Sequence, residues 1–169
     1  RAVRNMRLLG YQDRALPELL PATLRQDVLS AERRRVRYAS LGRIGSVGEL
    51  IETIVAKPGP RLVILNTVQS AAVVAREMRA AGHAVLHLST ALAPKDRGPI
   101  LDLVKLKLGG CPSDWSLVAT SCVEAGVDLS FRVAFRERFS VTSLIQIGGR
   151  TNRSGTFGTG DVFDFLLDG

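Results

Sequence analysis

The chain has 169 residues, 46% of them hydrophobic, which is the size and apolar content of one ordinary domain with a single core. No apolar run approaches the roughly 20 residues needed to cross a bilayer and nothing resembles a signal peptide, so we expect a cytoplasmic protein without a membrane partner. The net charge of +7, mostly from arginine, favours an anionic partner such as nucleic acid, although a merely basic surface would give the same composition.

Residues 1–32 contain Pro17 and Pro21 among leucines and arginines, with broken helical periodicity. This pattern predicts a connecting segment from a preceding domain, and a first residue Arg1 is what we expect of a piece of a longer polypeptide. The charged run at residues 33–38 predicts a short edge strand, with a phosphate-contacting stripe as the alternative. We expect residues 33–169 to form the compact domain.

Ser46 and Glu49 resemble a capping box and predict a helix over residues 47–57. From there strands and helices alternate in strict order, and the continuous apolar run at 61–66 is typical of a strand covered on both faces. We expect strands at residues 61–66, 84–88, 115–120, 133–136 and 161–167, and helices at 69–81, 95–108 and 141–147. This order predicts a three-layer α/β/α domain with a mainly parallel central sheet.

Ligands of such sheets bind at the carboxyl ends of the strands. We therefore expect the functional loops to start at Asn66, Ser89, Thr120 and Gly148.

The most specific pattern is the segment 146–153. Arg150 and Arg153 are three residues apart, on one face if helical, and follow the glycine pair Gly148-Gly149, which lets a backbone bend closely. Two guanidinium groups placed in this way can hold one polyphosphate.

Segment 146–153 matches the pattern Q-x-x-G-R-x-x-R, which is motif VI of superfamily 2 helicases. Residues 119–128 resemble motif V, residues 65–70 resemble motif IV, and residues 88–97 resemble the segment after the second strand. The chain is thus similar to the second RecA-like lobe of these helicases over about residues 60–167.

Within the superfamily, residues 88–97 and 123–128 look most like the CRISPR-associated helicase-nuclease of type I systems. DEAD-box proteins typically have Arg-Gly where this chain has Ala125-Gly126. This resemblance implies that a CRISPR surveillance complex is a possible partner.

The resemblance also implies roles for individual residues. Arg150 and Arg153 would be arginine fingers that reach the γ-phosphate of ATP, and Gln146 would help to sense the nucleotide. The remaining candidates are Asp128, Gly126 and Gly149 on the nucleotide side, with Asp128 binding the ribose or orienting the arginines, and Thr67 and Thr120 on the nucleic-acid backbone.

Several of these residues also have a purely structural interpretation. The two arginines could form surface ion pairs, and a Thr or Asp at a strand end often only caps a turn. Glu124 could pair with an arginine or anchor the motif V loop. We expect Ser89, Thr90 and Arg97 to shape a loop and the start of a helix.

The sequence has no G-x-x-x-x-G-K-[ST] loop and no Asp-Glu dipeptide. ATP with Mg²⁺ would therefore be held mainly by a first RecA-like lobe of the same chain, and the isolated piece is expected to be inactive. The His-Asp doublet of the family's nuclease domain is also absent. Cys111 and Cys122, with His83 and His87, offer too few ligands at the wrong spacing for a zinc site.

The sequence therefore predicts the C-terminal motor lobe of an ATP-dependent helicase or translocase. Its substrate would be single-stranded nucleic acid, and the resemblance points to DNA. The alternative is a non-catalytic helicase-like module that binds nucleic acid or a protein.

Overall fold

The computed structural model describes residues 21–110, 113–123 and 128–168. The chain divides into two compact units, residues 1–31 and 32–169. None of the helices in the described part of the chain is long and apolar enough to span a bilayer. The described elements, in chain order, are α2 (Ala22–Arg35), β1 (Val36–Ile44), α3 (Val47–Val55), β2 (Arg61–Ile64), α4 (Val68–Ala80), β3 (Val85–Leu88), α5 (Pro94–Gly109), β4 (Ser116–Ala119), the 3₁₀ turn η1 (Ser121–Val123), β5 (Val133–Glu137), α6 (Val141–Gly148) and β6 (Gly160–Leu167).

Every strand and helix that the sequence predicts from residue 47 onward is present, with ends that differ by no more than two residues. The expectation for residues 33–38 is partly wrong. Arg33, Arg34 and Arg35 form the last turn of α2, where cations interact favourably with the helix dipole, and the strand runs from Val36 to Ile44.

The central sheet has the order β1-β6-β5-β2-β4-β3, and all five pairings are parallel. The strand after α2 is an edge strand, as its charge predicts, and β1 pairs with β6 from Val36↔Gly160 onward. The three-layer α/β/α class is therefore correct, with a fully parallel sheet in the part of the chain that the structure describes.

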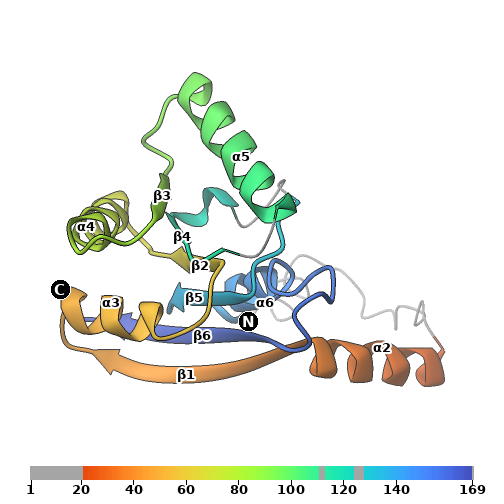
Figure 1. Cartoon of the computed structure of the whole chain (residues 1–169). Coiled ribbons are helices and arrows are strands. Elements are labelled where there is room, and N and C mark those ends of the chain that lie inside the picture. The colour runs from red at the N-terminus through yellow and green to blue at the C-terminus, as the bar shows by residue number, and fades with distance from the viewer. Residues whose placement is uncertain (1–20, 111–112, 124–127, 169) are drawn as a thin grey trace, which may run out of the picture. The chain divides into compact units, whose positions relative to one another are not determined.

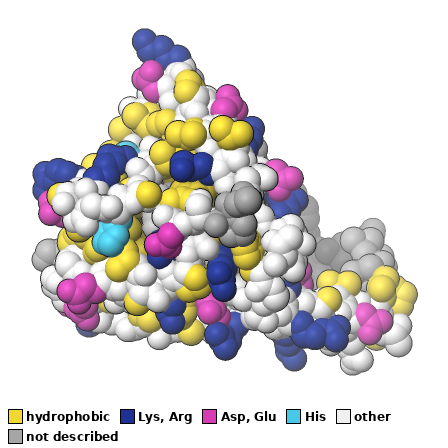
Figure 2. Space-filling view, in the orientation of Figure 1, with side chains coloured by type: hydrophobic (Ala, Val, Ile, Leu, Met, Phe, Trp, Pro, Cys, Tyr) yellow, Lys and Arg dark blue, Asp and Glu magenta, His cyan; other side chains and the backbone are white. Residues whose placement is uncertain are grey.

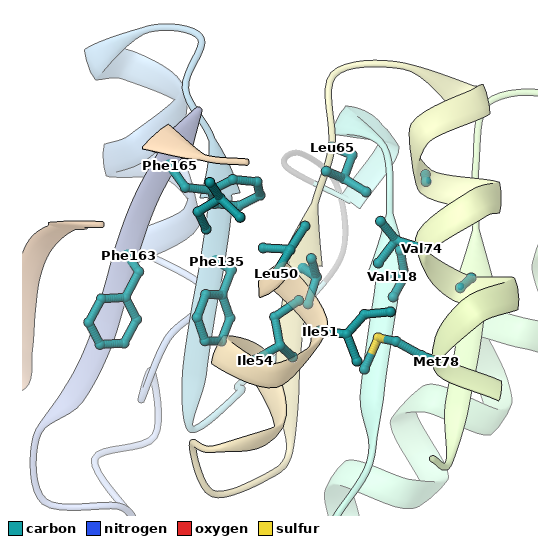
Figure 3. Packing of buried hydrophobic residues seen from close by; sticks show 14 of the residues in the cluster. Leu50, Ile51, Ile54, Leu65, Val74, Met78, Val118, Phe135, Phe163 and Phe165 are labelled. Atoms are coloured by element: carbon teal, nitrogen blue, oxygen red, sulfur yellow. The ribbon is translucent and has the colours of Figure 1, made fainter. Parts of the chain in front are cut away.

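Successive strand residues point to opposite faces and build two cores. Helices α3 and α4 cover one face, and α5 and α6 cover the other (Figure 1). On the first face, Phe135 stacks on Phe163 at a centroid distance of 5.3 Å, beside the α3 residues Leu50 and Ile54 (Figure 3). The central strands β2, β4 and β5 are thus buried on both sides, which fixes them as a rigid platform for the loops at either edge.

Local signals fix the ends of the helices. Ser46 Oγ accepts a hydrogen bond from Glu49 N at 3.2 Å, and the Glu49 carboxylate accepts one from Gly45 N, a capping box displaced by one residue. At the end of α4, Gly82 has φ +84°, and Gly82 N donates to Arg79 O while His83 N donates to Met78 O. This is a Schellman ending, in which glycine is the usual residue at the position of positive φ.

The half-buried His87 on β3 gives the fold a pH dependence. Burial lowers its pKa below the ordinary value of 6.5, although a backbone hydrogen bond to Val118 opposes the shift. As pH falls through 6.5, the unfolded chain binds the proton first, so stability is lost between 6.5 and the lower pKa of the folded state. We expect wild type to lose more stability than His87→Gln over this range in thermal melts from pH 8 to pH 5.

Parallel profiles for wild type and His87→Gln would contradict the assignment.

Candidate functional sites at the two edges of the sheet

The loops after β2, β3 and β4 meet at the carboxyl edge of the sheet, as expected. These strands are neighbours, and the chain leaves them at Asn66, Ser89 and Thr120. Hydrogen bonds join the loops, since Thr90 N donates to Thr120 Oγ1 at 3.1 Å.

Thr67 and Thr120 both use their hydroxyls inside the protein. Thr67 is exposed and is the N-cap of α4, where its Oγ1 accepts from Ser70 N at 3.0 Å. Thr120 is only 3% exposed and its hydroxyl also donates to Cys122 Sγ at 3.6 Å. Their contact with nucleic acid stays a prediction, and of the two only Thr67 presents an exposed side chain.

Arg97 shapes the loop after β3. Its Nη2 donates to Thr90 O at 2.7 Å and its Nε donates to Leu92 O at 2.8 Å. The expectation that Ser89, Thr90 and Arg97 form a loop and a helix start is therefore confirmed.

Asn66 joins the end of β2 to the end of β5. Its Oδ1 accepts from the buried Arg136 Nη1 at 2.7 Å, and its backbone N–H donates to the Glu137 carboxylate at 2.7 Å. The polar side chain after β2 is thus part of the platform.

Residues 149–153, which we call the arginine loop, lie at the opposite edge from the one predicted. Because β5 and β6 are parallel, α6 begins at the carboxyl end of β5 and returns the chain to the amino end of β6. Thr151 forms a parallel bridge with Phe131, two residues before β5. The loop that begins at Gly148 is therefore at the amino edge. The prediction that it lies at the carboxyl edge is wrong, because Gly148 ends the helix α6 and not a strand.

The bridge to Phe131 brings Asp128, the last residue of segment 119–128, close to segment 146–153. Phe131 N donates to Arg150 O at 2.8 Å, and Asn152 N donates to Phe131 O at 2.7 Å. The segment before Phe131 is thereby placed beside the loop, and Arg153 Nη1 lies 3.0 Å from Asp128 Oδ1. Both side chains are well exposed, so this ion pair contributes only about 0–1 kcal/mol.

The arginine loop is not helical, so its two arginines do not share a helix face. Asn152 is fully buried with φ +46°, a conformation that Asn tolerates better than most residues. Its Nδ2 donates to Gly158 O at 2.6 Å and to Arg35 O at 3.2 Å, and its Oδ1 accepts from Phe157 N at 3.0 Å. This buried amide sets the turn between Arg150 and Arg153.

The glycines provide close packing rather than an unusual bend. Gly149 is the C-cap of α6 with φ −65°, which any residue adopts. A Cβ at Gly148 would overlap the Tyr38 hydroxyl, and one at Gly160 would lie 2.7 Å from Thr151 Cγ2 and 2.8 Å from Asn152 Cβ.

The remaining predicted residues lie near this loop or outside the described residues. Gln146 is exposed on α6, one turn before the partly buried Arg150. Gly126 and Glu124 fall outside the described residues. Among the described residues, no group of three or more His, Cys, Asp or Glu side chains could hold a metal ion.

Arg35 and Asn152 contribute to this site and were missed from the sequence. Asn152, lying within the motif, could have been suspected from its preference for positive φ. Arg35 carries no such signal, because the loop residues that it contacts are more than 110 positions away.

Basic side chains are scattered over the face that Figure 2 shows, with acidic and apolar side chains between them. Several arginines near the amino edge are paired, for example Arg37 with Asp161 at 2.8 Å. The net charge alone therefore does not mark a binding site.

Gly160→Ala tests the packing beneath the arginine loop. The added Cβ would press on buried Thr151 and Asn152, so we expect the free energy of unfolding to fall by about 1–3 kcal/mol in urea titrations. Gly109→Ala, at the open end of α5, is the control and should change it by no more than about 0.5 kcal/mol. Equal effects of the two substitutions would show that Gly160 does not pack closely against Thr151 and Asn152.

Comparison with known proteins gives consistent matches. A family model described as the C-terminal part of the CRISPR-associated nuclease/helicase Cas3 matches residues 57–156. The CRISPR-associated nuclease/helicase Cas3 of Haloferax volcanii is 38% identical over 74 residues, which are 44% of this chain and 8% of that protein.

Solved structures share the fold. A crystal structure of T. fusca Cas3 with AMPPNP superposes with a TM-score of 0.68 and 16% identity, covering 81% of this chain and 19% of that chain. The C-terminal domain of the DEAD-box protein Dbp5 superposes with a TM-score of 0.63 and 17% identity, covering 80% of this chain and 78% of that domain. This chain therefore spans a small part of the Cas3 proteins that it matches.

Proposed function

Because this chain belongs to the family of the C-terminal region of the CRISPR-associated nuclease/helicase Cas3, we propose that it is the second motor lobe of an ATP-dependent helicase that moves on single-stranded nucleic acid. The family and the RecA-like fold support a helicase C-terminal lobe. The assignment of the ATP-facing and nucleic-acid-facing residues below is our proposal.

The observation that carries the proposal is the pairing of Phe131 with the arginine loop. It gathers Arg150, Arg153 and Asp128 at one edge of a rigid sheet, although Asp128 and Arg153 are 25 positions apart in the sequence. The Arg153–Asp128 pair, with Arg150 in the same loop, suits a nucleoside triphosphate, whose phosphates attract guanidinium groups and whose ribose hydroxyls can donate to a carboxylate.

In this proposal, ATP supplies the phosphoryl group that is transferred to water while a first lobe holds the nucleotide with Mg²⁺. Arg150 and Arg153 neutralise the negative charge that grows on the γ-phosphate oxygens, and Gln146 lies one turn away to sense the nucleotide. Because the Arg153–Asp128 pair is exposed and weak, Arg153 can exchange the carboxylate for a phosphate at little cost.

Nucleic acid would bind at the other edge. Thr67 stands at the start of α4, a helix of 13 residues whose first backbone N–H groups and dipole favour a phosphate. Thr120 belongs to the adjoining loop and would act through the backbone that it supports. The family points to DNA as the strand and to a CRISPR assembly as the setting.

The two proposed sites are connected by residues 119–128. This segment leaves β4 at the carboxyl edge, where Thr120 lies, and ends at Asp128 near the amino edge. Four-residue strands such as β4 separate the two edges by roughly 13 Å, and residues 124–127 of the connecting segment lie outside the described residues.

Arg150→Ala and Arg153→Ala test the first site. In a polypeptide that joins this lobe to a nucleotide-holding first lobe, we expect each substitution to lower nucleic-acid-stimulated ATP hydrolysis by about 10³-fold or more. Binding of ATP, measured by equilibrium titration, should be largely retained because the other lobe holds most of the nucleotide.

Arg76→Ala is the matched control, because Arg76 is an exposed arginine of α4 that pairs only with the adjacent Glu77 among the ion pairs described. It should keep the wild-type rate. Unchanged hydrolysis in both loop variants would reject arginine fingers and favour a non-catalytic helicase-like module.

Thr67→Asp and Thr67→Asn test the second site. Both residues cap a helix well and differ by one charge, so the pair separates capping from phosphate contact. A carboxylate about 4 Å from a phosphate costs about 1 kcal/mol in water, which is about a fivefold loss of affinity for single-stranded DNA.

The difference between the two variants should shrink as salt is raised, because exposed charges are screened. Fluorescence anisotropy with a labelled oligonucleotide measures the affinity of each variant. Equal affinities at low salt would place the strand elsewhere.

A further inference from the structure

The last turn of α2 is attached to the arginine loop. Arg35 Nη1 donates to Thr151 O, and Arg35 Nη2 donates to Gly148 O at 3.2 Å. The guanidinium group therefore bridges two backbone carbonyls that lie on either side of Arg150. Its side chain is only 20% exposed, so the bridge is largely shielded from water.

Glu32 fixes the orientation of this guanidinium group. Its two carboxylate oxygens accept from Arg35 Nε at 3.1 Å and from Nη2 at 2.7 Å, one turn earlier on the same helix. The hydrogen bond from Arg35 lowers the pKa of Glu32, so the carboxylate stays charged at neutral pH. All three nitrogens of the guanidinium group thus have partners that fix its plane.

The backbone at the end of α2 holds the other side of the same loop. Arg35 O accepts from Asn152 Nδ2 at 3.2 Å, and Arg34 O accepts from Thr159 Oγ1 at 3.1 Å. Side chain and backbone of one residue therefore contact positions 148, 151 and 152, and the arginine loop is supported from outside its own motif.

We propose that Arg35 is a positioning residue for Arg150 and Arg153, because it holds the carbonyls of Gly148 and Thr151 at a fixed separation and so sets the direction in which the two side chains leave the loop. This role rests on the proposed function, in which both arginines meet a nucleotide. Only a planar group with several fixed donors can bridge two carbonyls and a carboxylate in this way, so lysine cannot replace it.

The test uses Arg35→Ala and Arg35→Lys in the polypeptide that joins this lobe to a nucleotide-holding first lobe. A displacement of about 1 Å at a reacting group can cost about 10²-fold in rate, so we expect kcat for nucleic-acid-stimulated ATP hydrolysis to fall by about 10- to 100-fold in both variants. The KM for ATP should change by less than about twofold, because Arg35 contacts the loop and not the nucleotide.

Two further measurements separate positioning from general structural support. Guanidinium chloride at non-denaturing millimolar concentration should restore part of kcat in Arg35→Ala, where the side chain leaves a gap, and not in Arg35→Lys. Arg37→Ala is the matched control, because Arg37 is 71% exposed and paired with Asp161, and it should keep wild-type kcat.

Different results would overturn the positioning role of Arg35 and the proposed function. Wild-type kcat in Arg35→Ala, with hydrolysis lost in Arg150→Ala and Arg153→Ala, would overturn the positioning role alone. A loss of kcat without guanidinium rescue, accompanied by a matching fall in thermal stability, would also overturn it in favour of structural support. Unchanged rates in Arg150→Ala and Arg153→Ala would overturn the proposed function and the inference with it.

Discussion

The hydrogen bonds between Phe131 and the arginine loop are the interaction on which both the site and its neighbours depend. Phe131 is fully buried and lies two residues before β5, so its backbone is fixed by the sheet. By donating to Arg150 O and accepting from Asn152 N, it anchors a loop that would otherwise be an exposed connection between α6 and β6. The loop to which we assign a function is thereby attached to a rigid scaffold.

The interior of the loop is built from polar groups whose hydrogen bonds are made within the protein. Asn152 and Thr151 are fully buried, and their side chains bond to backbone groups of the same region. Such networks specify one conformation, because a buried polar group that loses its partner costs about 1–3 kcal/mol. The exposed Arg153, in contrast, has a weak partner and remains free to exchange it.

The parallel topology places the two proposed binding sites at opposite edges of one sheet. The turns after β2, β3 and β4 hold Thr67, Thr90 and Thr120 at the carboxyl edge, whereas the α6–β6 crossover places the arginine loop at the amino edge. A parallel sheet requires such a crossover for every strand, so sites on strand ends and on helix ends necessarily lie apart. The segment from Thr120 to Asp128 runs from one edge to the other, and its residues 124–127 lie outside the described part of the chain.

The sequence by itself determined the fold class and the elements from residue 47 onward. Periodicity, the caps at Ser46 and Gly82, and the apolar runs are local signals, and they placed each element from residue 47 onward within two residues. The tertiary structure alone decided the edge on which the arginine loop lies, because that depends on which strands pair and in which direction. It also decided that Arg35, more than 110 residues earlier, clamps the loop, since no local pattern encodes a contact between distant backbone carbonyls and one guanidinium group.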